Sequence, residues 1–420
     1  MEKGDIEVGL RLGASLYRFQ YVRGYLSAGR RWQHRLLDRS SGVDAEGPAH
    51  LRSLRAKVFR SAGSLAQAQG ETRQAQALLE RSLEISRLEG DSEQTAISLL
   101  ELGNAANESG AVERAATLYE ESQTLMQAIG LRRGVALILS NRGVLAEKQG
   151  NVVLASRLYE ESLTLFQELG VAGNTVRTQI NLADPLVSRG ESGHAELLYR
   201  ESLTMARAIG DALGIASAIG GLGDVARVQG MDDAAIAFYE DSLQRFHAMG
   251  SVRNAATVLL GPGEVLQRRG GPARARACAE ESLALARVTG DGRVVVDAVV
   301  TLADLARQHG DITQATAHYR EALTLSQEAG TTVGLPAGLE GLAATLVQRG
   351  ATANAVQLWA SASVLRTTQG VPIPVASRAV YEQWLDAVRR ALSQDDFDRA
   401  WLAGEAFTGD EAIPFALESA

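Results

Sequence analysis

The stretch Gly110–Gly130, GAVERAATLYEESQTLMQAIG, decides how this chain folds, because it recurs at a fixed distance. Similar stretches follow at Gly150–Gly170 (GNVVLASRLYEESLTLFQELG) and Gly190–Gly210 (GESGHAELLYRESLTMARAIG), forty residues apart each time. Two glycine series extend the period, one at positions 70, 110, 150, 190, 230, 270, 310 and 350, the other at 90, 130, 170, 210, 250, 290, 330 and 370. A fixed period of this length is typical of stacked supersecondary units. We therefore expect a solenoid rather than a globule with one central core.

Each forty-residue unit contains two stretches with helical spacing, here called helix A and helix B, separated by a glycine. Helix A carries a small residue at one phase, namely Gly63, Gly103, Gly143, Ala183, Gly223, Gly263, Ala303 and Ala343. Helix B carries an alanine in every unit, and four residues later come Leu79, Tyr119, Tyr159, Tyr199, Tyr239, Ala279, Tyr319 and Trp359. Residues four apart share one helix face. We therefore predict that the small residues allow close approach of the paired helices, and that the rings fill the space beside the alanines.

The Leu-Gly pairs of helix A, such as Leu102-Gly103 and Leu222-Gly223, and the Ala-x-x-x-Tyr pattern of helix B resemble the tetratricopeptide repeat. The usual period of that repeat is roughly 34 residues, so the longer period here implies longer helices. The resemblance implies an all-α, right-handed superhelical solenoid of tetratricopeptide-like hairpins with irregular caps at both ends. We assign residues 1–38 to a degenerate N-terminal hairpin cap, 39–50 to a loop, 51–370 to an eight-unit array and 371–420 to a C-terminal helical cap.

Several residues predict where individual helices begin, end or break. The recurring glycines suit the left-handed conformation that ends helices, and Asp211 and Asp291 are candidate N-caps. Pro262 lies inside a helix A, where it removes a hydrogen bond, so we expect that helix to be kinked or interrupted. The glycines gathered between residues 220 and 263 suggest the close approach of a ligand or of a neighbouring backbone.

Composition limits the classes of partner and the compartment. The net charge of −8 provides no basic footprint for nucleic acid. Cys278 is the single cysteine, which excludes an intrachain disulfide and fits a reducing compartment. The chain has no apolar run long enough to span a membrane, and its start lacks the apolar region of a signal peptide. We therefore expect a cytoplasmic protein.

The sequence offers no catalytic or metal-binding constellation that supports a reaction. The six histidines are scattered, and none lies at a zinc-ligand spacing from the cysteine. Gly261-Pro262-Gly263 is followed by neither a GxGxxG pattern nor a lysine, so it is not a phosphate loop. We expect no metal, no cofactor and no enzymatic activity.

The inner face of helix A is the best candidate for a binding surface, because the curvature of such solenoids creates a concave groove there. The residue after the small position is acidic in four consecutive units, at Asp184, Asp224, Glu264 and Asp304, which we call the acidic ladder. The candidate partner-binding residues are Asn104, Asn107, Asn141, Asn181, Asp184, Asp224, Arg227, Glu264, Gln267, Asp304 and Arg307. The ladder has two interpretations: ordinary inner-face polar residues with weak Asp–Arg pairs, or a groove for a basic protein or peptide segment.

The two ends of the chain carry a second, narrower resemblance. Leu358-Trp359, residues 370–374 (GVPIP), Tyr381-Glu382 and Ala400-Trp401 resemble the C-terminal repeat region of bacterial signal-transduction ATPases with numerous domains, including LuxR-type and AfsR-like transcriptional regulators. Residues 9–37 resemble the segment that follows the ATPase domain in those proteins. No GxxxxGK[ST] phosphate loop is present, and we expect no helix-turn-helix reader after Ala420, so the resemblance carries over neither ATP hydrolysis nor DNA binding.

We therefore expect a non-enzymatic sensor or scaffold module that binds a protein or peptide in its groove, as the repeat region of a bacterial signal-transduction and transcriptional regulator. Its expected partners are that segment and an ATPase domain in the same or a longer chain, with no direct contact to nucleic acid or membrane. Two alternatives stay open: a free-standing chaperone-like adaptor, and a receptor for a peptide signal.

Overall fold

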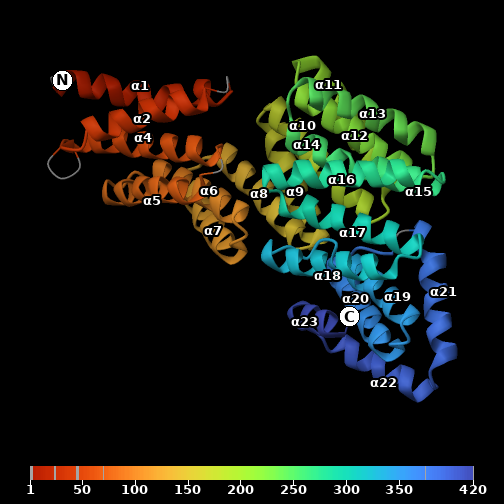
Figure 1. The fold of residues 1–420 in the computed structure, drawn as a ribbon. Helices are drawn as coiled ribbons and strands as arrows, with labels where there is room; N and C mark the ends of the chain where they lie inside the picture. The colour runs from red at the N-terminus through yellow and green to blue at the C-terminus, as the bar shows by residue number, and fades with distance from the viewer. Residues whose placement is uncertain (1–2, 23–24, 44–46, 70, 374, 420) are drawn as a thin grey trace. The chain divides into compact units, whose positions relative to one another are not determined.

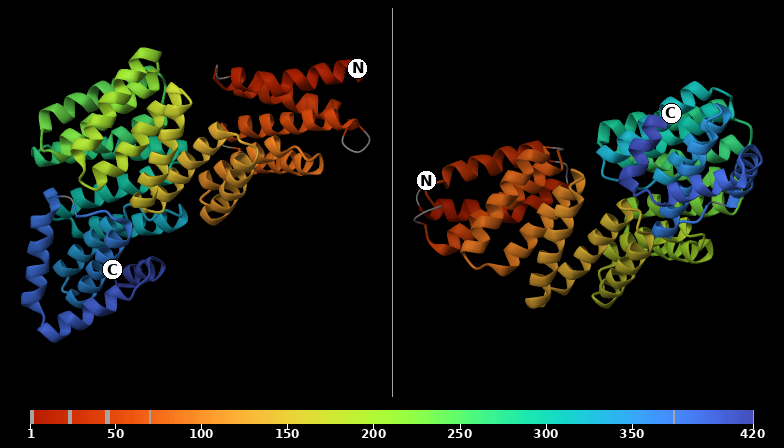
Figure 2. Two further views of the ribbon diagram at one scale, coloured as in Figure 1. Left: turned by 180° about the vertical axis from the view of Figure 1, so that it is seen from behind. Right: turned by 90° about the horizontal axis from the view of Figure 1, so that it is seen from below.

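The computed structural model describes residues 3–22, 25–43, 47–69, 71–373 and 375–419. Consecutive helices pack side by side as antiparallel hairpins (Figure 1), and the two views of Figure 2 show the same stacking from other directions. The chain forms two compact units, residues 1–145 and 146–420. The predicted all-helical solenoid of hairpins is confirmed.

The helices of the first unit are α1 (Lys3–Val22), α2 (Leu26–Arg39), α4 (Ala49–Gln67), α5 (Thr72–Leu88), α6 (Ser92–Glu108), α7 (Val112–Ala128) and most of α8 (Arg132–Lys148). In the second unit lie α9 (Val152–Glu168), α10 (Ala172–Ser188), α11 (Ser192–Ile209), α12 (Ala212–Val228), α13 (Asp232–Ala248), α14 (Val252–Val258), α15 (Leu260–Arg268), α16 (Pro272–Thr289), α17 (Gly292–Gln308), α18 (Ile312–Glu328), α19 (Leu335–Gln348), α20 (Thr352–Gln369), α21 (Val375–Ala391), α22 (Gln394–Glu405) and α23 (Gly409–Ser419). Most array helices are 17 residues long, in keeping with the longer helices that the forty-residue period implied.

The periodic glycines end the helices as predicted. From Gly90 to Gly370 they adopt left-handed φ values, for example 79° at Gly110 and 70° at Gly130. Glycine suits this region because it has no Cβ. The predicted N-caps are also confirmed: the Asp211 carboxylate accepts from the Gly214 N–H at 3.0 Å, and Asp291 caps α17 in the same way.

Pro262 and Pro185 have different effects on their helices. The helix that contains Pro262 is divided at Leu259 into α14 and α15, so the predicted interruption is confirmed. Pro185 leaves α10 continuous from Ala172 to Ser188. Since Pro185 lies in the last turn of α10, little of the helix remains beyond it.

The mid-helix glycines make room for tyrosine rings. A Cβ on Gly221 would lie 2.2 Å from Tyr199 Cε1, and a Cβ on Gly261 would lie 2.3 Å from Tyr239 Cζ. At Gly221 and Gly261 the expected ligand or neighbouring backbone is therefore replaced by a side chain. A buried aromatic side chain of the adjacent helix B occupies the space, which the sequence pattern of that helix already implied. A Cβ on Gly263, by contrast, would lie 3.6 Å from the Ala275 carbonyl oxygen, a neighbouring backbone as expected.

Hydrogen bonds join the start of the second unit, residues 148–149, to residues 331–332 much later in the same unit. After Gly330 the chain remains non-helical up to Gly334, and α19 begins only at Leu335. Thr331 Oγ1 donates to the Lys148 carbonyl at 3.0 Å, and Thr332 Oγ1 donates to the Gln149 carbonyl at 2.6 Å. These carbonyls lie at the end of α8, so residues 331–332 supply hydrogen bonds that the helix itself cannot provide.

We expect Thr331→Val to weaken this contact by about 1–2 kcal/mol, because Thr331 is 3% exposed and the loss leaves a buried carbonyl with fewer donors. Urea unfolding monitored by hydrogen exchange at residues 146–152 would measure the effect. Thr324→Val is the matched control, since its hydroxyl bonds only the Arg320 carbonyl within its own helix. Equal losses in both variants would contradict a role for Thr331 in joining the two segments.

The C-terminal helices cover the last hairpin. Phe397 and Ala400 of α22 are each 6% exposed and pack on the core around Trp359. Side chains cap the starts of α22 and α23, since Ser393 Oγ accepts from the Asp396 N–H at 3.2 Å and Thr408 Oγ1 from the Glu411 N–H at 3.3 Å. In the described part of the chain, no helix combines the length and apolarity that crossing a membrane requires.

Candidate functional site

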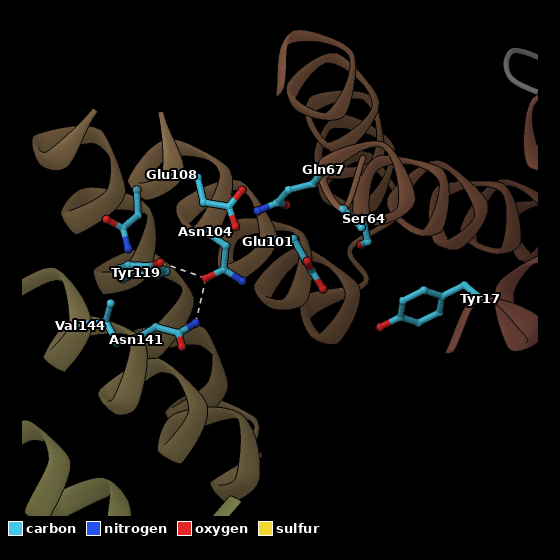
Figure 3. Close-up of a pocket in the computed structure, with 11 residues that line it drawn as sticks. Tyr17, Ser64, Gln67, Glu101, Asn104, Glu108, Tyr119, Asn141 and Val144 are labelled. Carbon is cyan, nitrogen blue, oxygen red and sulfur yellow. Dashed lines mark hydrogen bonds between the residues drawn. The ribbon is translucent and has the colours of Figure 1, made fainter. Parts of the chain in front are cut away.

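The first unit contains a cavity of about 530 Å³ on the inner face of its A helices (Figure 3). Its walls come from α1, α4, α6, α7 and α8, and its lining residues are Tyr17, Ser64, Gln67, Ala68, Glu101, Asn104, Asn107, Glu108, Tyr119, Asn141 and Val144. This volume is typical of ligand pockets, which range over roughly 300–1,000 Å³. Three candidate residues from the sequence, Asn104, Asn107 and Asn141, therefore meet in one pocket.

A hydrogen-bond network orients the amides in this pocket (Figure 3). Asn104 Oδ1 accepts from Tyr119 Oη at 2.9 Å and from Asn141 Nδ2 at 2.8 Å. With its oxygen engaged, the Asn104 side chain directs its amino group toward the pocket. Among the described residues no acceptor pairs with that amino group, and the Asn141 oxygen likewise has no donor. The pair thus offers one donor and one acceptor, the complement of a peptide group.

Two carboxylates lie on the same face of α6, seven residues apart. Glu101 is 3.9 Å from the Arg60 guanidinium, and burial raises its pKa against the opposing effect of Arg60. The Arg60 guanidinium also lies over the Tyr17 ring, 5.2 Å from its centroid, which is a cation–π contact. Glu108 is exposed and ends α6.

In the second unit, the ladder carboxylates accept hydrogen bonds from helix B tyrosines fifteen residues later. Tyr199 donates to Asp184, Tyr239 to Asp224 at 2.8 Å, and Tyr319 to Asp304 at 2.5 Å. The sequence analysis missed this pairing. Its signal was present, because ladder positions with Asp or Asn are followed fifteen residues later by tyrosine.

The arginines complete the ladder in two of these units. Arg227 reaches Tyr239 Oη at 3.2 Å and bridges to Glu264 at 2.5 Å, and Arg307 lies 3.4 Å from Asp304. Glu264 has no tyrosine of its own, because Ala279 occupies the corresponding position. The predicted Asp–Arg pairs form, but each also serves to hold a tyrosine hydroxyl.

Another carboxylate, Glu147, lies at the phase of Arg227 and Arg307 and bonds a tyrosine as the ladder acids do, and Arg293 supplies a counter-charge that sequence reasoning did not identify. Glu147 accepts from Tyr159 Oη at 3.1 Å, and the Arg293 guanidinium acts electrostatically on both Glu147 and Asp184. Arg293 itself pairs with Asp297 at 3.3 Å. Because 146 residues separate Glu147 from Arg293, only the fold brings these charges near one another.

The remaining candidate residues lie on the same helices without entering the hydrogen-bonded ladder. Asn181 is half-buried on α10. Gln267 is half-buried on α15, and its Nε2 has no hydrogen-bond acceptor among the described residues. In the same described part of the chain, no group of three or more His, Cys, Asp or Glu residues is arranged to hold a metal ion.

Asp184 makes the stability of the second unit depend on pH near neutrality. Burial, followed by repulsion from Glu147, raises the pKa of Asp184 to about 7 from 3.8. Because the pKa of Asp184 is higher in the folded state than in the unfolded state, protonation of Asp184 stabilises the folded state. This contribution to the free energy of unfolding is fully present below about pH 4. It is lost as pH rises through about 7, since the folded state binds the proton more tightly than the unfolded state.

We expect Asp184→Asn to raise the free energy of unfolding at pH 8 by about 1 kcal/mol and to flatten its decline between pH 5 and 8. This gain is smaller than the full pKa shift would give, because solvent reaches the Asp184 side chain and screens its charge. Urea titrations at several pH values would measure it. Asp241→Asn is the matched comparison in the same unit and should slightly lower stability across this range, because it removes an exposed ion pair with Arg245. An unchanged pH slope in Asp184→Asn would contradict the prediction.

Comparisons with known proteins agree with the fold. The tetratricopeptide repeat profile matches residues 39–128, 134–208 and 254–328, together more than half of the chain. Over 84 residues, 20% of this chain, the sequence is 37% identical to proteins of Mycobacterium tuberculosis and Mycobacterium bovis, each named "Putative HTH-type transcriptional regulator". That match spans only 9% of the length of those relatives.

Solved structures with a similar fold include a Rap protein complexed with competence and sporulation factor. It has a TM-score of 0.59 at 13% identity, covering 94% of this chain and 99% of that one. The apo form of the quorum sensor NprR from B. thuringiensis has a TM-score of 0.54 at 15% identity, covering 86% of this chain and 98% of that one. At these identities the likeness concerns the fold alone.

Proposed function

This chain belongs to the tetratricopeptide repeat family, and we propose that it is a non-enzymatic module that binds a protein or peptide segment on the inner face of its A helices. The observation that carries the proposal is the polar cavity of the first unit. Its oriented amides, Asn104 and Asn141, present a donor and an acceptor to whatever enters. An extended peptide has matching groups at every residue.

Two further observations favour a binding role. The cavity walls combine amides, hydroxyls and carboxylates from consecutive A helices, a surface suited to a ligand extended across several repeats. The solved Rap structure with a similar fold was determined with competence and sporulation factor bound, and NprR is described as a quorum sensor. A peptide signal is therefore one candidate ligand class, alongside a protein segment held by an adaptor.

We propose further that the module serves a bacterial transcriptional regulator of the ATPase-coupled type. The 37% identity to the mycobacterial proteins supports this assignment. In such a regulator, a ligand on the inner face would bias an attached ATPase domain, provided that it binds the two states with different affinity. Ligand-dependent ATPase activity of the longer protein would test this coupling, and activity indifferent to a bound ligand would contradict it.

The binding function can be tested with a random decapeptide display library selected on the full 420-residue chain. We expect a related set of peptides to be enriched. Their affinity for Asn141→Ala should fall, because that variant removes the oriented amide. Incubation with the protein should leave the mass of each peptide unchanged. Absence of enrichment would contradict the binding function, and cleavage or modification of the peptides would contradict the non-enzymatic assignment.

A second experiment tests whether the acidic ladder of the second unit takes part in peptide binding. Asp224→Asn and Asp304→Asn, measured with the same peptides at several salt concentrations, would show whether the ladder contributes to recognition. A lower affinity and a shallower salt dependence would place the ligand along the ladder. Unchanged values would leave the ladder the structural role that its tyrosine bonds already give it.

A further inference from the structure

We infer that the cavity of the first unit recognises a cationic side chain, a lysine or arginine of the bound peptide, and that Glu108 is the residue that selects it. This inference rests on the proposed peptide-binding function and adds the chemical class of the ligand. It comes from the charges of the cavity, the position of Glu108 on its helix, and the contacts of the neighbouring Glu101.

The charged residues that line the cavity are all acidic. Its lining contains two carboxylates, Glu101 and Glu108, and no lysine, arginine or histidine. The negative charge reaches the buried Tyr119 hydroxyl, whose pKa is raised first by burial and next by Glu108. A cation entering the cavity would therefore be attracted, and an anion repelled.

The C-terminal ends of two helices add to the negative potential in the cavity. Gln67 is the last residue of α4 and Glu108 the last of α6, so the cavity lies beside the C-terminal ends of both helices. The macrodipole makes these ends negative and favours cations there. A carboxylate at such a position disfavours the helix itself, which points to a role other than stability.

The sequence shows that the acidic pair is specific to this unit. Residues at the phase of Glu108 in the other units are Ala68, Lys148, Ser188, Val228, Arg268, Gln308 and Gln348. Residues at the phase of Glu101 are Ser61, Asn141, Asn181, Gly221, Gly261, Thr301 and Gly341. Both carboxylates thus replace residues that are neutral or basic elsewhere in the array.

The two carboxylates have different partners. Glu101 has the Arg60 guanidinium at 3.9 Å, so the chain itself supplies part of its counter-charge. Glu108 forms no ion pair with any described residue, and it lies near the Gln67 amide at the rim of the cavity (Figure 3). The ligand cation is therefore placed at Glu108, with the peptide backbone on Asn104 and Asn141.

The test uses the full chain, Glu108→Gln and the matched control Glu113→Gln. Glu113 is an exposed glutamate at the start of α7 outside the cavity, so its substitution changes the net charge equally. The random decapeptide library is selected on each protein, and one enriched peptide is then synthesised with its basic residue intact or replaced by glutamine. Affinities are measured by calorimetry at low and physiological salt.

We expect lysine or arginine to be enriched on the wild type and on Glu113→Gln but not on Glu108→Gln. The Arg-to-Gln change should weaken binding to the wild type roughly ten-fold and to Glu108→Gln much less, since it removes a charge-assisted hydrogen bond. Two results would overturn the inference while leaving peptide binding intact. One is the enrichment of peptides without a basic residue, and the other is an equal loss of affinity for the wild type and for Glu108→Gln when the basic residue of the peptide is replaced by glutamine. No enrichment on any protein would refute the binding function and the inference with it.

Discussion

Gly404→Ala is expected to detach the C-terminal helix α22 from α20, at a cost of about 3 kcal/mol. The Cβ would lie 2.2 Å from the Gln357 carbonyl oxygen and 2.6 Å from Gln357 Cα. Because both atoms belong to the backbone, no side-chain rotation can relieve the overlap, and overpacking of this kind costs about 1–3 kcal/mol or more. The slight gain in helix propensity does not offset it.

The effect should be local and measurable by hydrogen exchange. Amides of residues 394–405 should exchange faster, because Phe397 and Ala400 lose their packing as α22 moves away. Gly409→Ala is the matched control in the same cap, since its Cβ would make only ordinary contacts, at 3.7 and 3.9 Å, with leucine side chains. Similar exchange in both variants would contradict the proposed close approach of α22 to the α20 backbone.

Gly221→Ala is expected to destabilise the second unit by about 2 kcal/mol. Its Cβ would lie 2.2 Å from Cε1 and 2.3 Å from Cζ of Tyr199, whose side chain is fully buried. The ring would have to leave a tightly packed site, which costs about 1–3 kcal/mol. Since Tyr199 donates to Asp184, the same displacement should weaken that hydrogen bond and alter the pH dependence of stability.

Gly173→Ala provides the control for this prediction. Gly173 lies in α10 with open space around its Cβ position, so alanine should be neutral or stabilise by up to about 1 kcal/mol. Urea unfolding of the two variants at pH 5 and pH 8 would separate the packing effect from the effect on Asp184. A Gly221→Ala protein as stable as Gly173→Ala would show that the Tyr199 site accommodates a methyl group.

The hairpins, their ends and the interruption at Leu259 followed from local sequence features. The glycine series marks left-handed helix ends, Asp211 and Asp291 mark N-caps, and Pro262 marks the break between α14 and α15. Each feature acts through atoms within a few residues of itself. Such features repeat with the sequence, so a period of forty was sufficient to predict the architecture.

Residues of the candidate surface could be predicted as a set, but their pairing could not. The prediction that Asn104 and Asn141 both lie on the inner face was correct, and the two side chains are hydrogen-bonded. The tyrosine partners of the ladder acids were missed. The clue was an interval of fifteen residues between helix A and helix B. That interval becomes informative once the crossing of the two helices is known, because the crossing determines which hydroxyl faces which carboxylate.

The chain's own residues were sufficient to predict its repeat, its helix boundaries and the composition of the inner face, because these depend on short-range periodicity and steric constraints. The cavity beside Glu108, the approach of Arg293 to Glu147, and the bonds from Thr331 to the end of α8 required the three-dimensional structure. They depend on small rotations between successive repeats, which accumulate over many units. No single repeat encodes where residues separated by more than one hundred positions meet.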